Sequence, residues 1–221
     1  MIEAVFFDVD DTLVDYASTA RRALDEAMRS GDSYDLWQEV SGPYFERYAR
    51  GEIGYEPMRI ERTAAFLHAL GRDADAGRAA AFEQARFTAL NRSFVLFDDV
   101  LACLDALRAR SLRLGVITNN DGQYQRRKLA MVGLDDAFDA IAISGEIGAG
   151  KPDPLIFVHA CTALGVAPAA ALHVGDRLDA DALGALGAGL TGVWLDRLGA
   201  AGDERRVPVV STLSAVPALV A

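Results

Sequence analysis

Short apolar runs alternate with helical patterns over the second half of the chain. The runs that predict strands cover residues 112–118, 140–144, 171–175, 191–195 and 207–210. Between them, apolar residues recur every three or four positions, which is the spacing of one face of a helix. Strands that alternate with helices are typical of a parallel sheet covered by helices. We therefore predict a doubly wound α/β core with a parallel sheet.

The first part of the chain has a different pattern. Residues 5–7 form an apolar, aromatic and β-branched run that is typical of a buried central strand. From residue 15 to residue 96 there is no strand signal, and four amphipathic helical segments are separated by short links with Gly and Asp. These segments predict a four-helix bundle inserted after the first strand. The predicted core comprises residues 1–14 and 97–221, and the predicted helical domain comprises residues 15–96.

The first strand ends in three carboxylates and a hydroxyl, namely Asp8, Asp10, Asp11 and Thr12. Asp8 and Asp10 are two residues apart, so on an extended backbone they project to the same side. Two crowded carboxylates repel each other unless a cation lies between them, and Mg²⁺ suits oxygen ligands. The alternative is a structural Asp-rich turn. That alternative is less favoured because three further polar motifs follow along the chain.

The second motif is Thr118-Asn119-Asn120, at the end of the strand predicted over residues 112–118. Small donors at a strand end, with a helix directly after them, can hold a phosphate group. Alternatively, Thr118 or Asp121 caps the following helix. We favour a functional role for Thr118 and a capping role for Asp121.

The third motif is Lys151-Pro152-Asp153-Pro154. Lysine is scarce, since Lys128 and Lys151 are the only two in the chain against twenty arginines. The compact Lys151 ammonium suits a phosphoryl oxygen or a carboxylate nucleophile. The alternative, a solvated loop lysine, is less favoured because of this position and scarcity. Asp153 is interpreted as a helix cap, with Pro154 in the first turn.

The fourth motif follows the strand at residues 171–175. Asp176 comes directly after that strand and is a predicted metal ligand. Asp181, five residues further, could reach the metal directly, through water, or hold Lys151 instead. Asp179 is interpreted as an acid at a helix start, and His173 as a packed core histidine.

In this order the four motifs resemble those of the haloacid dehalogenase superfamily of aspartate-nucleophile hydrolases, and the helical insertion resembles the helical cap of its first cap class. The resemblance implies Asp8 as nucleophile and Asp10 as general acid/base. It implies that the substrate phosphate is bound by Thr118, Asn119 and Lys151. It implies Mg²⁺ ligation by Asp8, the backbone carbonyl of Asp10, and Asp176. Thr12 and Asp181 would support the site.

The predicted function is that of a Mg²⁺-dependent phosphatase acting on a small phosphorylated metabolite. Two enzymatic alternatives on the same scaffold are a sugar phosphomutase and a 2-haloacid dehalogenase-type hydrolase. A non-catalytic protein with the same fold is a further alternative. Dehalogenases of the superfamily lack the second acid and the metal, so Asp10 favours phosphoryl transfer. A cap sets specificity in this superfamily, and the candidate lining residues are Tyr16, Tyr44, Tyr48 and Tyr55, although packing within the bundle explains each equally well.

The composition of the chain limits the kinds of binding partner and the cellular compartment that we expect. The net charge of −10 argues against nucleic-acid binding through a basic surface. Cys103 and Cys161 are interpreted as buried thiols of a reducing compartment. The chain starts without a basic leader, and no apolar run approaches the length of a membrane span. We therefore expect a cytoplasmic protein without membrane contact.

Overall fold

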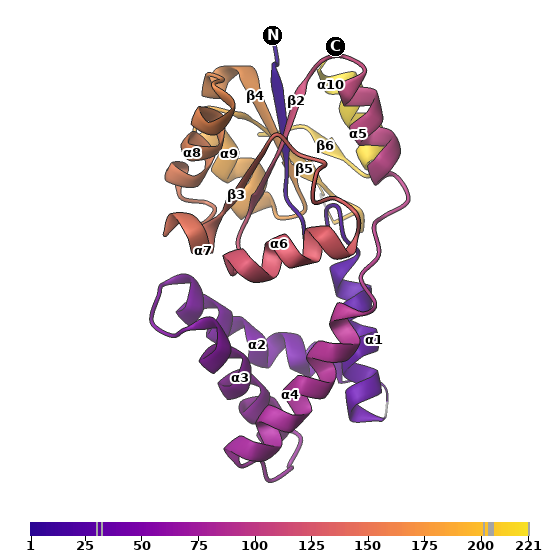
Figure 1. Ribbon diagram of the computed structural model, residues 1–221, viewed down its shortest axis with the longest axis vertical. Coiled ribbons are helices and arrows are strands. Elements are labelled where there is room, and N and C mark those ends of the chain that lie inside the picture. Colours follow the sequence, from indigo (N-terminus) through magenta and orange to yellow (C-terminus); the bar gives the residue numbers. More distant parts are fainter. Residues whose placement is uncertain (30, 32, 201, 203–205, 221) are drawn as a thin grey trace. The chain divides into compact units, whose positions relative to one another are not determined.

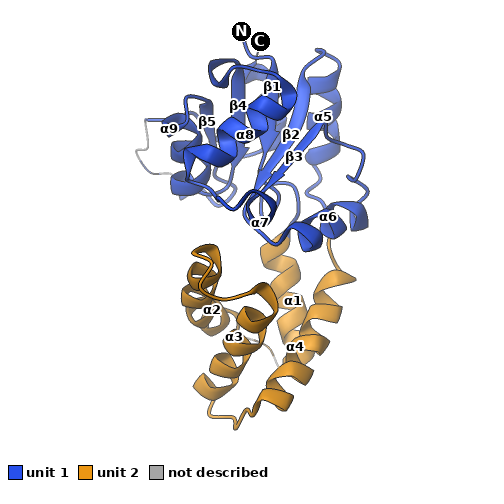
Figure 2. Cartoon of the chain, turned by 60° about the vertical axis from the view of Figure 1, so that its left-hand side comes forward, with its two compact units in different colours: residues 1–15, 95–221 blue, residues 16–94 orange. Residues whose placement is uncertain are grey.

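The computed structural model describes residues 1–221 apart from residues 30, 32, 201, 203–205 and 221. The chain divides into two compact units (Figure 2). The first comprises residues 1–15 and 95–221, and the second comprises residues 16–94. All strands of the described residues lie in the first unit.

Six parallel strands form one sheet in the order β3-β2-β1-β4-β5-β6. They are β1 (Ala4–Phe7), β2 (Arg113–Thr118), β3 (Ala140–Ile143), β4 (Ala171–Gly175), β5 (Thr191–Leu195) and β6 (Val209–Val210). All four residues of β1 are buried, because the strand has neighbours on both sides and packed side chains on both faces. This explains its continuous apolar run. The predicted doubly wound α/β core is confirmed.

Helices cover both faces of the sheet (Figure 1). The α-helices of this unit are α5 (Val100–Arg108), α6 (Gly122–Met131), α7 (Ser144–Ile147), α8 (Pro154–Leu164), α9 (Gly184–Gly187) and α10 (Val216–Leu219). The short helical segments are η1 (Pro168–Ala170), η2 (Leu178–Leu183) and η3 (Leu213–Ala215). Helices α8 and α9 lie on one face, and α5 and α10 on the other. Phe157 of α8 packs in one core cluster with Phe6 of β1 and Ile117 of β2.

Two sequence details of this unit are explained by its local structure. The predicted caps are confirmed, because Asp121 accepts from the Tyr124 N–H at 2.9 Å and Asp153 accepts from the Leu155 N–H at 2.9 Å. Strand β6 is shorter than the predicted run of residues 207–210. Pro208 has no N–H to donate to a neighbouring strand, so it cannot take a full place in the ladder.

The chain leaves β1 through a tightly bonded loop. The N–H groups of Leu13 and Val14 both donate to the Val9 carbonyl at 2.9 Å, and the Asp11 N–H donates to the Val14 carbonyl at 2.8 Å. Asp11 has a φ of 60°, in the left-handed region that Asp tolerates better than most residues. These bonds fix the backbone that carries the first motif.

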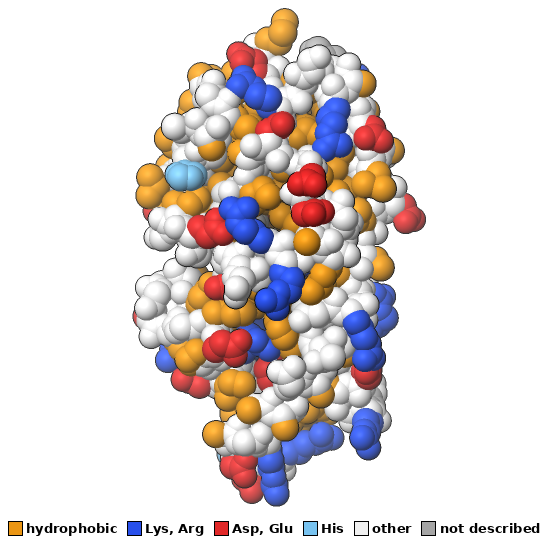
Figure 3. Space-filling model, viewed as in Figure 1, with side chains coloured by type: hydrophobic (Ala, Val, Ile, Leu, Met, Phe, Trp, Pro, Cys, Tyr) orange, Lys and Arg blue, Asp and Glu red, His pale blue; other side chains and the backbone are white. Residues whose placement is uncertain are grey.

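The second unit consists of α1 (Tyr16–Met28), α2 (Tyr34–Ala49), α3 (Tyr55–Ala69) and α4 (Ala76–Asn91). Its core includes Leu24, Trp37, Phe66 and Leu90, and the rings of Trp37 and Phe66 meet edge-on at 5.1 Å. In the described parts of the chain, no helix combines the length and apolar content needed to cross a membrane. On the face in Figure 3, basic side chains are interspersed with acidic ones rather than gathered in one patch.

Candidate active site

Polar segments from three strands meet at one edge of the sheet. Asp8 directly follows β1, Thr118 ends β2, and Asp176 directly follows β4. The chain runs from β1 outward to β2 and β3 on one side, and from β4 to β6 on the other. Open α/β sheets bind ligands at the carboxyl ends of the strands where the order reverses in this way. Asp8 and Asp176 therefore flank the expected ligand position.

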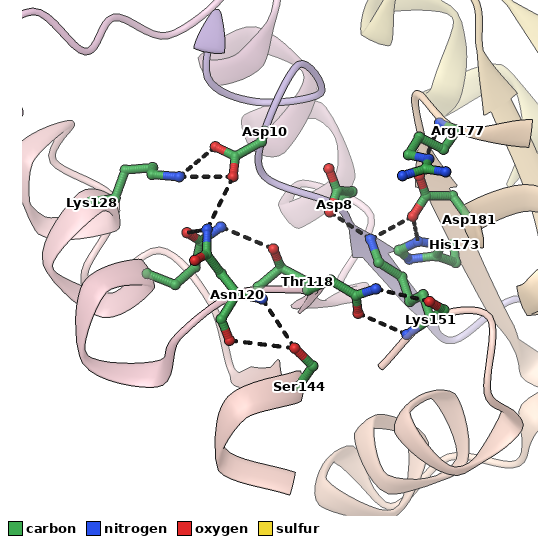
Figure 4. A network of polar contacts seen from close by, with 12 residues as sticks. Asp8, Asp10, Thr118, Asn120, Lys128, Ser144, Lys151, His173, Arg177 and Asp181 are labelled. Atoms are coloured by element: carbon green, nitrogen blue, oxygen red, sulfur yellow. Dashed lines mark hydrogen bonds and ion pairs between the residues drawn. The ribbon is translucent and has the colours of Figure 1, made fainter. Parts of the chain in front are cut away.

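The Lys151 ammonium lies between two carboxylates (Figure 4). Its Nζ donates to Asp8 Oδ1 at 2.5 Å and to Asp181 Oδ1 at 2.5 Å. All three side chains are buried. Burial alone would lower the pKa of Lys151, but Asp181 and Asp8 outweigh it and raise that pKa. Lys151 is therefore a fixed cation next to Asp8.

Asp181 is held by more than Lys151. The Arg177 N–H donates to its Oδ2 at 3.0 Å, and His173 Nε2 lies 3.0 Å from its Oδ1. Burial alone would raise the pKa of Asp181, but Lys151 and His173 bring it below its ordinary value. A Cβ on Gly175, the last residue of β4, would lie 2.2 Å from Asp181 Cγ, so glycine is required for this approach.

His173 is packed in the core, as predicted, with its ring edge-on to Phe157 at 5.4 Å. Its contact with Asp181 was not predicted from the sequence. Burial lowers the pKa of His173, although Asp181 opposes this shift. The neutral ring can therefore donate one hydrogen bond to the carboxylate that holds Lys151.

Three carboxylates crowd the centre of the site. One oxygen from each of Asp8, Asp176 and Asp181 lies within 4.8 Å of the others. Burial raises the pKa of Asp8 to about 7, although Lys151 opposes the shift. Burial, with Asp8 and Asp181 nearby, raises the pKa of Asp176 to about 8. Such a cluster of oxygens, two of them from buried carboxylates and one from a half-buried carboxylate, is suited to a hard divalent cation.

The second motif contributes Thr118 and Asn119. The Asn119 side chain donates to the Lys151 carbonyl at 2.8 Å and accepts from the Lys151 N–H at 2.7 Å. This pair of bonds fixes the backbone of the loop that carries Lys151. The buried Thr118 hydroxyl accepts from Gln125 Nε2 at 2.9 Å, which leaves its own proton available to a ligand.

The Asp10 carboxylate lies apart from this cluster and points toward α6 (Figure 4). Lys128 Nζ donates to Asp10 Oδ1 at 2.6 Å and to Oδ2 at 2.8 Å. Asn120 Nδ2 lies 3.5 Å from Oδ2, and it also donates to Gln125 Oε1 at 3.1 Å. Sequence reasoning missed Lys128 and Gln125. The scarcity of lysine, which singled out Lys151, applied equally to Lys128.

The other residues of the first motif have different surroundings. Thr12 is fully buried, and its hydroxyl has no hydrogen-bond partner among the described residues. The Thr12 carbonyl accepts from Arg197 at 3.0 Å, and Arg197 also forms a bidentate pair with Asp99. These contacts attach the end of the motif loop to the segment that precedes α5.

A model of the haloacid dehalogenase-like hydrolase family matches residues 2–189. The chain belongs to this family. The matched region contains all four motifs, from Asp8 to Asp181. The predicted resemblance is confirmed.

Individual relatives match nearly the whole chain. N-acylneuraminate-9-phosphatase from Mus musculus is 33% identical over 232 residues, covering 96% of this chain and 87% of the relative. A glyceraldehyde 3-phosphate phosphatase from Methanopyrus kandleri is 34% identical, covering 89% and 85%. Among solved structures, an L-2-haloacid dehalogenase from Xanthobacter autotrophicus has a TM-score of 0.79 at 25% identity, covering 100% of this chain and 98% of that one. Phosphatases and dehalogenases of this family thus both resemble the chain.

Proposed function

We propose that the chain is a Mg²⁺-dependent phosphatase that hydrolyses a small-molecule phosphate monoester through an aspartyl phosphate on Asp8. The observation that carries the proposal is the contrast between two neighbouring carboxylates. Asp8 is buried against Lys151, whereas Asp10 points away and pairs with Lys128. Asp8 shares the predicted cation position with Asp176, whereas the Asp10 side chain lies beside that position and remains 26% exposed, which suits one nucleophile and one acid/base.

In the first step an Asp8 oxygen attacks phosphorus, and the bond from phosphorus to the ester oxygen breaks. Asp10, protonated at that moment, transfers its proton to the departing alkoxide, so an alcohol leaves. In the second step water attacks the same phosphorus, and the bond from phosphorus to Asp8 breaks. Asp10 takes the proton from that water, which restores both carboxyl groups to their starting forms.

Fixed donors would hold the phosphoryl oxygens. Lys151 is kept charged and in place by Asp8 and Asp181, and Thr118 has a proton to donate. Asn119 acts on the same group indirectly, because its side chain fixes the Lys151 backbone. Preorganised donors of this kind stabilise the charge that develops in the transition state.

The described residues fit Mg²⁺, because oxygens of the buried Asp8 and Asp181 and of the half-buried Asp176 converge and a hard cation relieves their repulsion. We propose that Asp8, Asp176 and the backbone carbonyl of Asp10 hold the ion. Asp181 would act through Lys151, since its oxygens already contact Lys151, His173 and Arg177. When bound, Mg²⁺ supplies positive charge that offsets the charge of the phosphoryl group.

The dehalogenase alternative has weaker support. A halide departs as a stable anion and needs no proton, so an acid/base in the position of Asp10 would have no task. A sugar phosphomutase would use both carboxylates, and an activating bisphosphate would be required for its turnover. The phosphatase names of the relatives support hydrolysis.

We propose that the helical unit is a cap that selects the alcohol of the substrate. This unit comprises residues 16–94 in the structure, and the range predicted from the sequence is residues 15–96.

The test measures phosphate release from an aryl phosphate and from a panel of metabolite monoesters with Mg²⁺. Asp8→Asn is expected to retain about a hundredth of wild-type activity or less, because the substitution removes the nucleophile. Asp179→Asn, on an exposed acid of η2, is the matched control and is expected to stay active. Borohydride reduction of quenched enzyme should convert Asp8 to homoserine, which mass spectrometry detects.

Three results would contradict the proposal. They are full activity of Asp8→Asn, turnover unaffected by EDTA, and release of halide from 2-chloropropionate without any release of phosphate from the panel.

A further inference from the structure

The two lysines of this chain contact the two carboxylates assigned to catalysis. Lys151 contacts Asp8, and Lys128 contacts Asp10. The other twenty basic side chains are arginines. Asp8 and Lys151 belong to the motifs described above, whereas Lys128 lies on α6, outside all four.

Lys128 is fully buried, with a side-chain exposure of 0%. A buried ammonium is costly unless it is paired. Its Nζ lies 2.6 Å and 2.8 Å from the two oxygens of Asp10, and 5.0 Å from the centre of the Tyr124 ring. The Asp10 side chain remains 26% exposed, so the lysine of this ion pair is shielded from solvent whereas the carboxylate is accessible.

This contact restricts the Asp10 carboxylate. A single ammonium that bridges both oxygens fixes the rotation of the carboxylate about its Cβ–Cγ bond. Proton transfer requires the acid to lie within hydrogen-bond reach of the reacting oxygen, so a rotated carboxylate would transfer its proton poorly. When Asp10 carries its proton on one oxygen, Lys128 holds the other oxygen, and the protonated oxygen is the one left for a ligand.

We propose that Lys128 is the positioning residue of Asp10, holding its carboxylate in the orientation for proton exchange with the leaving group and the attacking water. This inference rests on the proposed phosphatase function. Lys128 itself does not touch the substrate. Its contribution is therefore largest for esters whose leaving group needs a proton.

Helix α6 also carries a second buried polar residue, Gln125, which serves as a comparison for Lys128 because it contacts a different group. Gln125 lies one turn before Lys128 and is equally buried, but it donates to the Thr118 hydroxyl at 2.9 Å. It therefore orients the proposed phosphate-binding group, which every ester uses alike. Its link to Asp10 is indirect and weak, because it passes through Asn120, whose Nδ2 lies 3.5 Å from Asp10 Oδ2. Gln125→Met is expected to weaken turnover of all esters by the same factor. Lys128→Met is expected to act selectively.

The experiment compares kcat for an alkyl phosphate and an aryl phosphate, with Mg²⁺, in wild type, Asp10→Asn, Lys128→Met and the double variant. Lys128→Met is expected to slow the alkyl ester about 10-fold more than the aryl ester, because a good leaving group needs little protonation. In the Asp10→Asn background the same change is expected to have no further ester-selective effect, because the two residues act as a unit. The exposed Arg127→Met is the control for charge removal on α6.

Equal losses on both esters in Lys128→Met, or an undiminished selective loss in the double variant, would overturn the inference. Circular dichroism checks the fold. If Lys128→Met lacks the wild-type spectrum, Lys128→Gln replaces it with the same two outcomes. A wild type inactive on both esters would instead refute the phosphatase function. An ester-selective Asp10→Asn beside an unselective Lys128→Met would refute the positioning role alone.

Discussion

Asp176 and Asp181 belong to one motif but have different partners. The Asp181 oxygens contact Lys151, His173 and the Arg177 N–H. The Asp176 side chain has an oxygen within 4.8 Å of both Asp8 and Asp181, while its carbonyl accepts from the Trp194 indole at 2.9 Å. Under the proposed function, Asp176 would bind the metal and Asp181 would position Lys151.

Mg²⁺ titration of activity is expected to distinguish the two acids. Asp176→Asn should raise the Mg²⁺ concentration needed for half-maximal turnover, because it removes a charged ligand. Asp181→Asn should lower kcat about 10- to 100-fold with a smaller change in Mg²⁺ requirement, as for loss of a supporting partner. A Mg²⁺ requirement raised equally in both variants would place Asp181 on the metal.

For single residues, the sequence predicted the site side chains that lie at the ends of strands. Asp8, Thr118 and Asp176 each end an apolar run, so the parallel sheet brings them to one edge. Lys128 could not be placed in this way. It is 118 residues from Asp10 and lies on a helix, and only the folded chain brings the two together.

Among the elements, α3 and α4 share a buried charged cluster. Glu83 of α4 accepts hydrogen bonds from Arg59, Arg62 and Arg86, and all four side chains are buried. Burial alone would raise the pKa of Glu83, but the arginines, Arg86 first, lower it to about 2. The helical pattern did not predict this cluster, because periodicity assigns charged residues to the solvent face.

Glu83→Gln is expected to lower the free energy of unfolding by about 3–5 kcal/mol, because it leaves buried arginines without their counter-charge. Denaturant unfolding followed by circular dichroism measures this loss. Glu61→Gln is the matched control, since Glu61 pairs with Arg47 at 3.1 Å on the exposed surface. That change should cost about 1 kcal/mol or less. Equal effects of the two substitutions would mean that the buried cluster adds no stability.

For the whole molecule, Asp8 and Asp176 predict how stability depends on pH without metal. Their folded pKa values, about 7 and about 8, exceed the ordinary 3.8, so the folded chain binds more protons between about pH 4 and pH 8. The lowered pKa of His173 acts in the opposite direction, but two raised carboxylates outweigh one imidazole, so stability in EDTA should fall as pH rises through this range. Asp176→Asn should reduce the slope, and Mg²⁺ should stabilise the protein more at pH 8 than at pH 5. Denaturant midpoints at several pH values measure this, and a stability that rises across the range would contradict it.

The proposed role of the helical unit in selecting the alcohol of the substrate can also be tested. Tyr48 and Tyr55 have ring centres 5.6 Å apart, Arg47 lies over Tyr44, and these tyrosines are half-buried. Alanine at Tyr44 or Tyr48 should change kcat/KM unequally across a panel of metabolite monoesters, by about 1–3 kcal/mol of discrimination. Acetyl phosphate, with its small leaving group, is the reference substrate. A uniform loss, acetyl phosphate included, would mean that these rings only pack the bundle.

The central position of β1 has a consequence for biosynthesis. This strand is made first, but its two neighbours are residues 113–118 and 171–175. On the ribosome, the apolar segment at residues 4–7 therefore emerges long before either partner exists. The helices of residues 16–94 are contiguous and can assemble from local contacts in the meantime. The nascent chain must keep this fully apolar strand from wrong pairings until β4 has been synthesised, which makes this the interval in which a chaperone would be most useful.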